Sequence, residues 1–120
     1  MKLWFSSRAE TLATEPFNFI TDNKFVVHFF LSMMYADEVQ VGWDPAIAAH
    51  EVGGKIYYDY TVQSAGGIET VYRTKKILSD IGADALHGRG TRVWEAVKLE
   101  GGKEVGESAA LKDVWIDQIE

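Results

Sequence analysis

Two glycines and a lysine near the end of the chain have the residue types and spacing needed to hold phosphate groups. Gly88 and Gly90 stand in the run Gly-Arg-Gly-Thr-Arg-Val, and Lys112 follows Ala110 by two residues in the next apolar segment. Glycines at a turn between strands let backbone amides approach phosphate oxygens, and a lysine on the neighbouring strand neutralises their charge. A small alanine before the lysine leaves room for a flat base. The pattern therefore predicts phosphate-holding chemistry here.

A Gly-x-Gly pair is weak evidence when taken alone, because any tight turn between two strands can use it. The ordinary alternative is a plain hairpin whose lysine is solvated. Lys112 adds only modest support for a phosphate site, so the choice between a phosphate site and a plain hairpin rests on the rest of the chain.

Other site chemistries have little support in the sequence. The chain has no cysteine, which excludes disulfides, thiolate metal sites and a cysteine nucleophile. His28, His50 and His87 are too scattered to predict a metal site. No nucleophile-elbow pattern surrounds any serine. We therefore predict neither a metal site nor a catalytic residue.

The composition indicates one globular domain of 120 residues with an acidic surface. Apolar residues make up 47% and charged residues 25%, and 18 acidic against 12 basic residues give a net charge of -6. This balance opposes binding to nucleic acid or to an anionic membrane. The longest apolar stretch, residues 25–35, is too short to span a membrane, and the N-terminus lacks the apolar run of a secretory signal. We expect an intracellular protein, cytoplasmic or nuclear.

The first part of the chain predicts two short strands and one helix. Residues 3–7 read as a strand, and residues 9–14 as a second extended piece. Thr21 or Asp22 is expected to cap a helix over about residues 23–36, whose apolar positions recur at helical spacing. This face is expected to be core, or else a surface for self-association or a protein partner. Its main residues are Phe25, Phe29, Phe30, Met33 and Met34.

The second part predicts two antiparallel hairpins. Residues 42–45 have turn chemistry, and residues 55–62 alternate between apolar and polar as a strand does. Residues 68–78 are expected to pair with them, and residues 92–99 with 108–116 around a Gly-Gly turn. Four to six strands and one principal helix indicate an α+β fold with an antiparallel sheet.

Seven sequence blocks between Leu3 and about Asp117 resemble the fungal-type protein kinases. Several of these blocks lie outside the glycine and lysine motif, so general kinase similarity would not produce them. The blocks are Leu3 to Arg8, Glu15 to Ile20, Phe29 to Ser32, Gly42 to Pro45, Leu78 to Asp80, Gly88 to Ala96 and Leu111 to Trp115.

The resemblance implies roles for five residues in a kinase-like small lobe. Gly88, Gly90 and Val93 resemble the phosphate loop and the strand over the adenine, while Ala110 and Lys112 resemble the adenine-wall alanine and the phosphate-binding lysine. It also implies ATP with Mg as the ligand of the complete family protein, with none expected to bind tightly here. The loop has no third glycine and Val93 comes two residues early, so a shorter loop would cover the phosphates less completely.

The sequence lacks the residues that transfer phosphate in kinases. No His-Arg-Asp, Asp-Phe-Gly or Ala-Pro-Glu occurs in it, so the base, the metal-binding aspartate and the activation segment have no candidates. Lys112 also needs a positioning glutamate from the helix after its strand, and Glu120 is not assigned that role. We expect a single domain in which residues 1–80 are specific to the family and residues 81–120 form a partial small lobe.

Three functional hypotheses follow. The first is an N-terminal portion of a fungal-type protein kinase-like protein without phosphotransfer activity by itself. The second is a non-catalytic interaction or regulatory module that pairs with a relative or another protein. The third is a part of an active ATP-dependent protein kinase, for which downstream His-Arg-Asp and Asp-Phe-Gly patterns would be the evidence.

Overall fold

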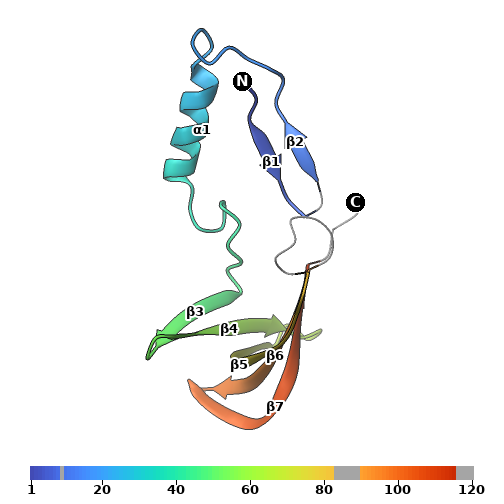
Figure 1. Ribbon diagram of the computed structural model, residues 1–120. Coiled ribbons are helices and arrows are strands. Elements are labelled where there is room, and N and C mark those ends of the chain that lie inside the picture. Colours follow the sequence, from blue (N-terminus) through green and yellow to red (C-terminus); the bar gives the residue numbers. More distant parts are fainter. Residues whose placement is uncertain (9, 83–89, 116–120) are drawn as a thin grey trace. The chain divides into compact units, whose positions relative to one another are not determined.

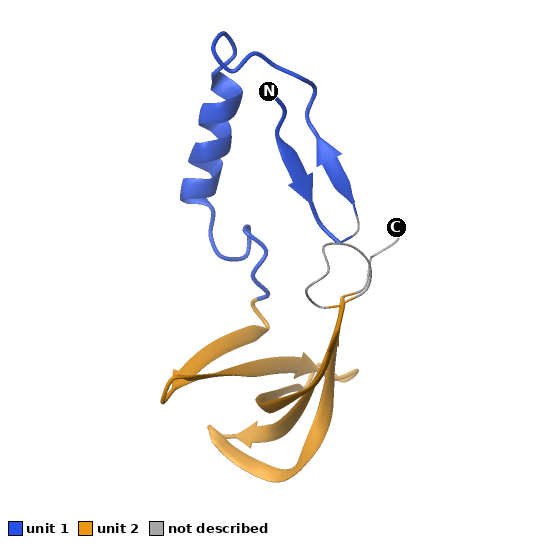
Figure 2. Cartoon of the chain, in the orientation of Figure 1, with its two compact units in different colours: residues 1–44 blue, residues 45–120 orange. Residues whose placement is uncertain are grey.

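The computed structural model describes residues 1–8, 10–82 and 90–115 and shows a helix and strands in the order β1-β2-α1-β3-β4-β5-β6-β7 (Figure 1). The strands are antiparallel, and α1 is the one helix of the described residues, which confirms the predicted α+β class. The chain divides into two compact units, called unit 1 for residues 1–44 and unit 2 for residues 45–120 (Figure 2). Each unit has its own sheet.

Unit 1 begins with a short hairpin. Strands β1 (Trp4–Ser6) and β2 (Thr11–Ala13) pair antiparallel. The backbone amide of Thr14 extends the ladder by donating to the carbonyl of Leu3 at 3.0 Å. The hydroxyls of Ser6 and Thr11 lie 3.0 Å apart across the pair. Both predicted extended segments are therefore present, although each strand is only three residues long.

Helix α1 spans Lys24–Tyr35, close to its predicted range, but its cap differs from the prediction. The capping residue is Asn23, already in helical conformation with φ -60° and ψ -18°, and no side chain caps the first turn. The prediction of Thr21 or Asp22 as cap is therefore wrong. The chain enters the helix through a separate turn, in which the Asn18 side chain accepts two backbone amides at 2.9 and 3.4 Å.

No residue of α1 is buried. Phe30 is 59% exposed and Met34 75% exposed, so the expectation that this face is core is wrong for unit 1. The three-residue strands of the hairpin are too small to cover a helix of 12 residues. The Phe25 ring of the helix lies against the ring of Phe17, with the ring centroids 5.3 Å apart. Within the described part of the chain, no helix is long and apolar enough to cross a membrane.

Unit 2 is one antiparallel sheet in which each strand pairs with the next, in the order β3-β4-β5-β6-β7. The strands are β3 (Ile47–Val52), β4 (Lys55–Gln63), β5 (Glu69–Ile81), β6 (Thr91–Glu100) and β7 (Lys103–Val114). Four of them were predicted from the sequence. β3 was missed, and β7 begins five residues before the predicted start.

The sheet of unit 2 is strongly twisted (Figure 1). The Tyr60 hydroxyl on β4 donates to Asp113 Oδ2 on β7 at 3.2 Å, although β5 and β6 lie between these strands in the sheet. Neighbouring strands are about 4.8 Å apart, so this contact requires the sheet to coil toward the Tyr60 side. Irregularities in the pairing of β5 with β6 and of β6 with β7 increase the local twist.

The small core of unit 2 lies inside this curve. Ala96 is 0% exposed and Thr74 is 2% exposed, and the two are cross-strand partners. The Thr74 hydroxyl accepts the backbone amide of Tyr58 at 2.9 Å. The last backbone pair between β4 and β5 is Asp59 with Arg73, directly beside Tyr58 and Thr74. Beyond this pair, the hydrogen bond from Tyr58 to the threonine side chain takes the place of backbone pairing.

Candidate functional site

The lysine and the valine of the predicted phosphate site are direct neighbours in the sheet. Val93 on β6 is the register partner of Lys112 on β7 and of Ser79 on β5. Directly opposed residues of antiparallel strands place their side chains on the same face. Lys112, Val93 and Ser79 therefore form one row across three strands.

A second row lies two residues further along β6 and β7 and, because the pairing of β5 with β6 is irregular there, three residues further along β5. Ala110 is the partner of Glu95, which in turn pairs with Lys76. Side chains two residues apart on a strand share a face, so Ala110 lies beside Lys112 as the sequence pattern predicted. We call the surface formed by Lys76, Ser79, Val93, Glu95, Ala110 and Lys112 the β5–β7 face.

Gly90 lies directly before β6 and is buried. Its carbonyl accepts the backbone amide of Trp115 at 3.1 Å, which ties the start of β6 to the end of β7. Gly88 lies outside the described residues. The structure therefore places four of the five predicted site residues on two adjacent strands and directly before one of them.

The charge of Lys112 is not engaged elsewhere in the described part of the chain. Lys112 is exposed, and none of the ion pairs among residues 1–8, 10–82 and 90–115 includes it. Val93 beside it is half-buried, and Ala110 is exposed. The face thus combines Lys112, which has no ion-pair partner among the described residues, with the half-buried Val93, the exposed Ala110 and the carboxylate of Glu95.

Contacts on the opposite face of β7 fix the direction of Lys112. Asp113 accepts the hydrogen bond from Tyr60, and Leu111 is the register partner of Trp94. Strand residues alternate between faces, so holding Asp113 toward Tyr60 directs Lys112 to the other side. Burial, together with the nearby Asp113 carboxylate, raises the pKa of Tyr60 to about 12. The tyrosine is therefore a neutral donor at ordinary pH.

Sequence reasoning missed this anchor for a physical reason. Tyr60 and Asp113 are 53 residues apart, and their contact depends on the register of four strands and on the coiling of the sheet. Alternation alone placed Tyr60 on the apolar face of its strand. No local pattern could have named its partner.

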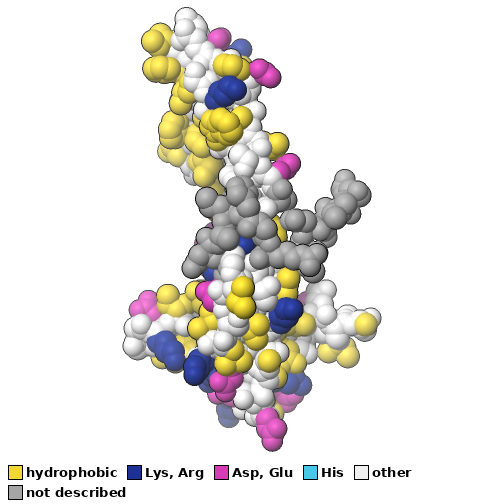
Figure 3. Space-filling model, turned by 45° about the vertical axis from the view of Figure 1, so that its right-hand side comes forward, with side chains coloured by type: hydrophobic (Ala, Val, Ile, Leu, Met, Phe, Trp, Pro, Cys, Tyr) yellow, Lys and Arg dark blue, Asp and Glu magenta, His cyan; other side chains and the backbone are white. Residues whose placement is uncertain are grey.

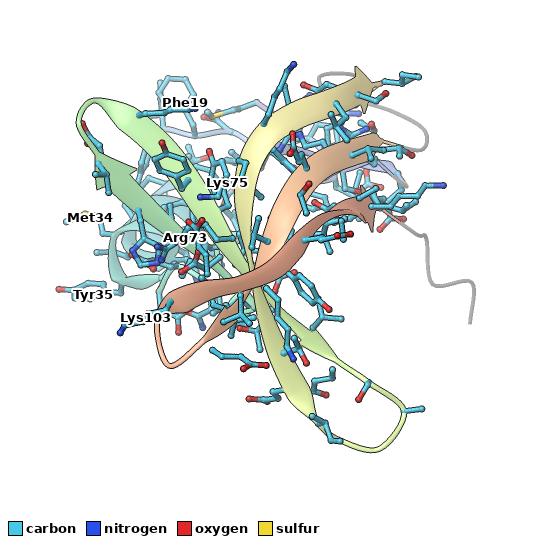
Figure 4. The ribbon with its side chains drawn as sticks, turned by 90° about the horizontal axis from the view of Figure 1, so that it is seen from below. Phe19, Met34, Tyr35, Arg73, Lys75 and Lys103 are labelled. Carbon is cyan, nitrogen blue, oxygen red and sulfur yellow. The ribbon has the colours of Figure 1, made fainter. Side chains whose placement is uncertain are left out.

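A separate charged cluster joins β3, β4 and β5. Asp59 accepts two hydrogen bonds from Arg73, each 2.8 Å, and its Oδ2 lies 3.1 Å from His50 Nε2. The hydrogen bonds from Arg73 lower the pKa of the Asp59 carboxyl despite its partial burial, and Asp59 in turn raises the pKa of Arg73. Lys75, which lies near Arg73 on β5 (Figure 4), pairs with Glu104. These charges are satisfied by one another, which indicates a structural role.

Metal coordination finds no support in the described residues, where no group of three or more His, Asp or Glu side chains could hold an ion. His28 and His50 lie in different units, and His87 lies outside the described residues.

Comparisons with known proteins give one match. The family model described as fungal protein kinase matches residues 1–119. Neither the curated proteins nor the solved structures yield a match. The matched range includes unit 1 as well as the strands of the β5–β7 face.

Proposed function

Because this chain belongs to the fungal protein kinase family, we propose that the β5–β7 face holds the phosphates and base of ATP. The observation that carries the proposal is the register of Lys112 with Val93, on a strand that begins directly after Gly90. This register places a cation and an apolar side chain on one face, close to a glycine. Kinase-type nucleotide sites combine these three features.

Each residue has a distinct task in this proposal. Lys112 supplies a positive point charge for the phosphate oxygens, and nothing in the described residues competes for it by ion pairing. Val93 and Ala110 provide the surface on which the adenine ring lies. Gly90 adds no side chain where the backbone before β6 would approach the phosphates. ATP itself supplies the transferable phosphoryl group when it is bound with Mg.

We further propose that these 120 residues do not transfer phosphate by themselves. The sequence contains no His-Arg-Asp and no Asp-Phe-Gly. Positioning a nucleophile and holding two metal ions supply most of the catalysis in phosphoryl transfer. Lys112 and Ala110 are exposed, so a nucleotide on this face would bury little area, and we expect millimolar affinity.

Thermal unfolding with nucleotide tests the proposal. A ligand with millimolar affinity, present at 10 mM, stabilises the folded state by about 1.4 kcal/mol. This corresponds to a rise in Tm of several degrees for a unit of this size. We expect Mg-ATP to raise Tm by this amount, and Lys112→Ala to abolish the rise without lowering Tm in the absence of nucleotide.

Lys103→Ala is the matched control, because Lys103 is also exposed and stands at the other end of β7. It should keep the full shift. No shift in the wild-type chain, or an equal shift in Lys112→Ala, would contradict the nucleotide site. A phosphotransfer signal from the purified chain that disappears in Lys112→Ala would contradict the inactivity while supporting the site.

A second candidate function is protein interaction through unit 1. The observation in its favour is that α1 has no buried residue although most of its side chains are large and apolar. Such a surface is typical of a binding site for another protein surface.

A further inference from the structure

Helix α1 is apolar over most of its surface, and Lys24, His28 and Ser32 form one polar stripe along it. It carries no acidic side chain. A helix with so wide an apolar surface normally packs against protein over most of that surface. In unit 1 its large side chains remain exposed, as Figure 3 shows for the hydrophobic groups gathered over this part of the chain. They are Phe25, Val27, Phe29, Phe30, Leu31, Met33, Met34 and Tyr35.

A cleft lies between α1 and the β1–β2 hairpin. It consists of two depressions of about 820 and about 680 Å³. The first is lined by Phe17 and Phe25 among others, and the second by Trp4 and Met33. Both share Phe29 and Ser32, so they meet at the middle of the helix. Together they follow α1 from its first turn to its last.

The dimensions and chemistry of the cleft suit a helix. The stripe from Phe25 to Met33 is about 12 Å long at 1.5 Å per residue, and packed helices lie about 8–10 Å apart. The second depression is lined without any charged side chain. The first depression is lined by two carboxylates, Glu15 and Asp22, against one ammonium group, Lys24, and by His28. The second depression therefore suits the apolar side of a helix, and the apolar residues of α1 provide such a side.

We propose that unit 1 forms a two-fold symmetric dimer in which the cleft of each copy holds α1 of the other. The two helices then pack side by side through their cleft faces, around Phe29 and Ser32. Their outer faces, which carry Phe30 and Met34, lie against the β1–β2 hairpin of the other copy. The arrangement is self-consistent, because the helix of each copy lies between the helix and the hairpin of the other copy. In this proposal, which rests on the second candidate function, the protein partner of unit 1 is a second copy of the chain.

The available area favours this exchange over a simple pair of helices. A stable interface needs about 800 Å² from each partner. The apolar side chains of α1, 40–83% exposed, offer roughly 900 Å² if each exposes about 200 Å² when free. Two helices that pack only against each other would each bury one side, or roughly half of this exposed apolar area. Adding Trp4, Phe5 and Leu12 of the hairpin, 51–68% exposed, raises the total to roughly 1,200 Å².

Sedimentation equilibrium and multi-angle light scattering test the dimer. We expect a mass near twice 13.4 kDa at tens of micromolar. Because the exchange uses both sides of α1, Phe30→Glu on the outer side and Met33→Glu on the cleft side should each weaken association at least tenfold. Ile68→Glu is the control, since Ile68 is also an exposed apolar residue, at 68% against 59% for Phe30 and 54% for Met33, but belongs to unit 2. It should leave the dimer unchanged.

A cross-link tests the geometry independently of charged substitutions, which could also loosen the helix. The chain has no cysteine, so Ser32→Cys introduces one thiol at the middle of the cleft face. It should form an intermolecular disulfide under mild oxidation, while Ser108→Cys on β7 should not. A chain that stays monomeric, or a dimer that survives both glutamate variants, overturns the proposal. A monomer whose unit 1 binds an apolar dye, with the dye lost in Met33→Glu, overturns the second copy as occupant but leaves the interaction role.

Discussion

Ala96→Leu is expected to destabilise unit 2 by roughly 3 kcal/mol, at the upper end of the range for overpacking a core. Ala96 is 0% exposed and lies between its register partners Thr74 and Ala109. The concave face of the coiled sheet leaves no space for three more carbon atoms there. Denaturant unfolding followed by the fluorescence of the tryptophans measures the change.

Ala49→Leu is the control for this prediction, because Ala49 lies exposed on β3 and receives the same change in volume. It should alter stability by less than about 0.5 kcal/mol. Equal effects of the two substitutions would show that Ala96 is not enclosed as described, and the coiling of the sheet would have to be revised.

Arg73→Met is expected to cost roughly 1–3 kcal/mol at neutral pH, because it leaves the Asp59 carboxylate without its bidentate partner. The Asp59 side chain is only 12% exposed, so water replaces the lost hydrogen bonds incompletely. Only the His50 contact remains. Chemical unfolding at pH 7 measures the loss.

The pH dependence of this effect has a defined sign. Arg73 lowers the pKa of Asp59 below its ordinary value of 3.8, so the stabilisation is present above pH 3.8 and is lost as the pH falls through the folded-state value. The difference between wild type and Arg73→Met should therefore shrink in acid. Lys98→Met is the control, since the Lys98–Glu100 pair is exposed on both sides and should matter little. A difference that persists unchanged in strong acid would exclude the carboxylate as its cause.

Local patterns predicted the elements that depend on local chemistry. Alternation in residues 55–62 and β-branched residues in 68–78 predicted β4 and β5, and helical spacing predicted α1 to within one residue at each end. Strand β3 was missed because it follows a Pro-containing turn and begins with an Ala-rich stretch of weak strand preference. Gly53 and Gly54, with φ of 60° and 76°, form the turn that could have indicated it.

The candidate site was predictable in part for the same reason. Alternation put Ala110 and Lys112 on one face from the sequence alone, and the register then added Val93 as their neighbour. The Tyr60–Asp113 anchor and the Asp59–Arg73 pair could not be predicted, because they depend on which strands are neighbours and on the curvature of the sheet. The exposure of α1 was not predictable either, since the same apolar pattern describes a core helix and an unpartnered one.

Titration of the isotope-labelled chain with Mg-ATP, followed by the backbone amide signals of its NMR spectrum, tests the central claim most directly. The nucleotide proposal predicts shifts at Gly90, Val93, Ala110 and Lys112 and their neighbours on β6 and β7, saturating at millimolar nucleotide and absent in Lys112→Ala. Signals that do not move at 10 mM Mg-ATP, or that move only on β3 and β4, would contradict it.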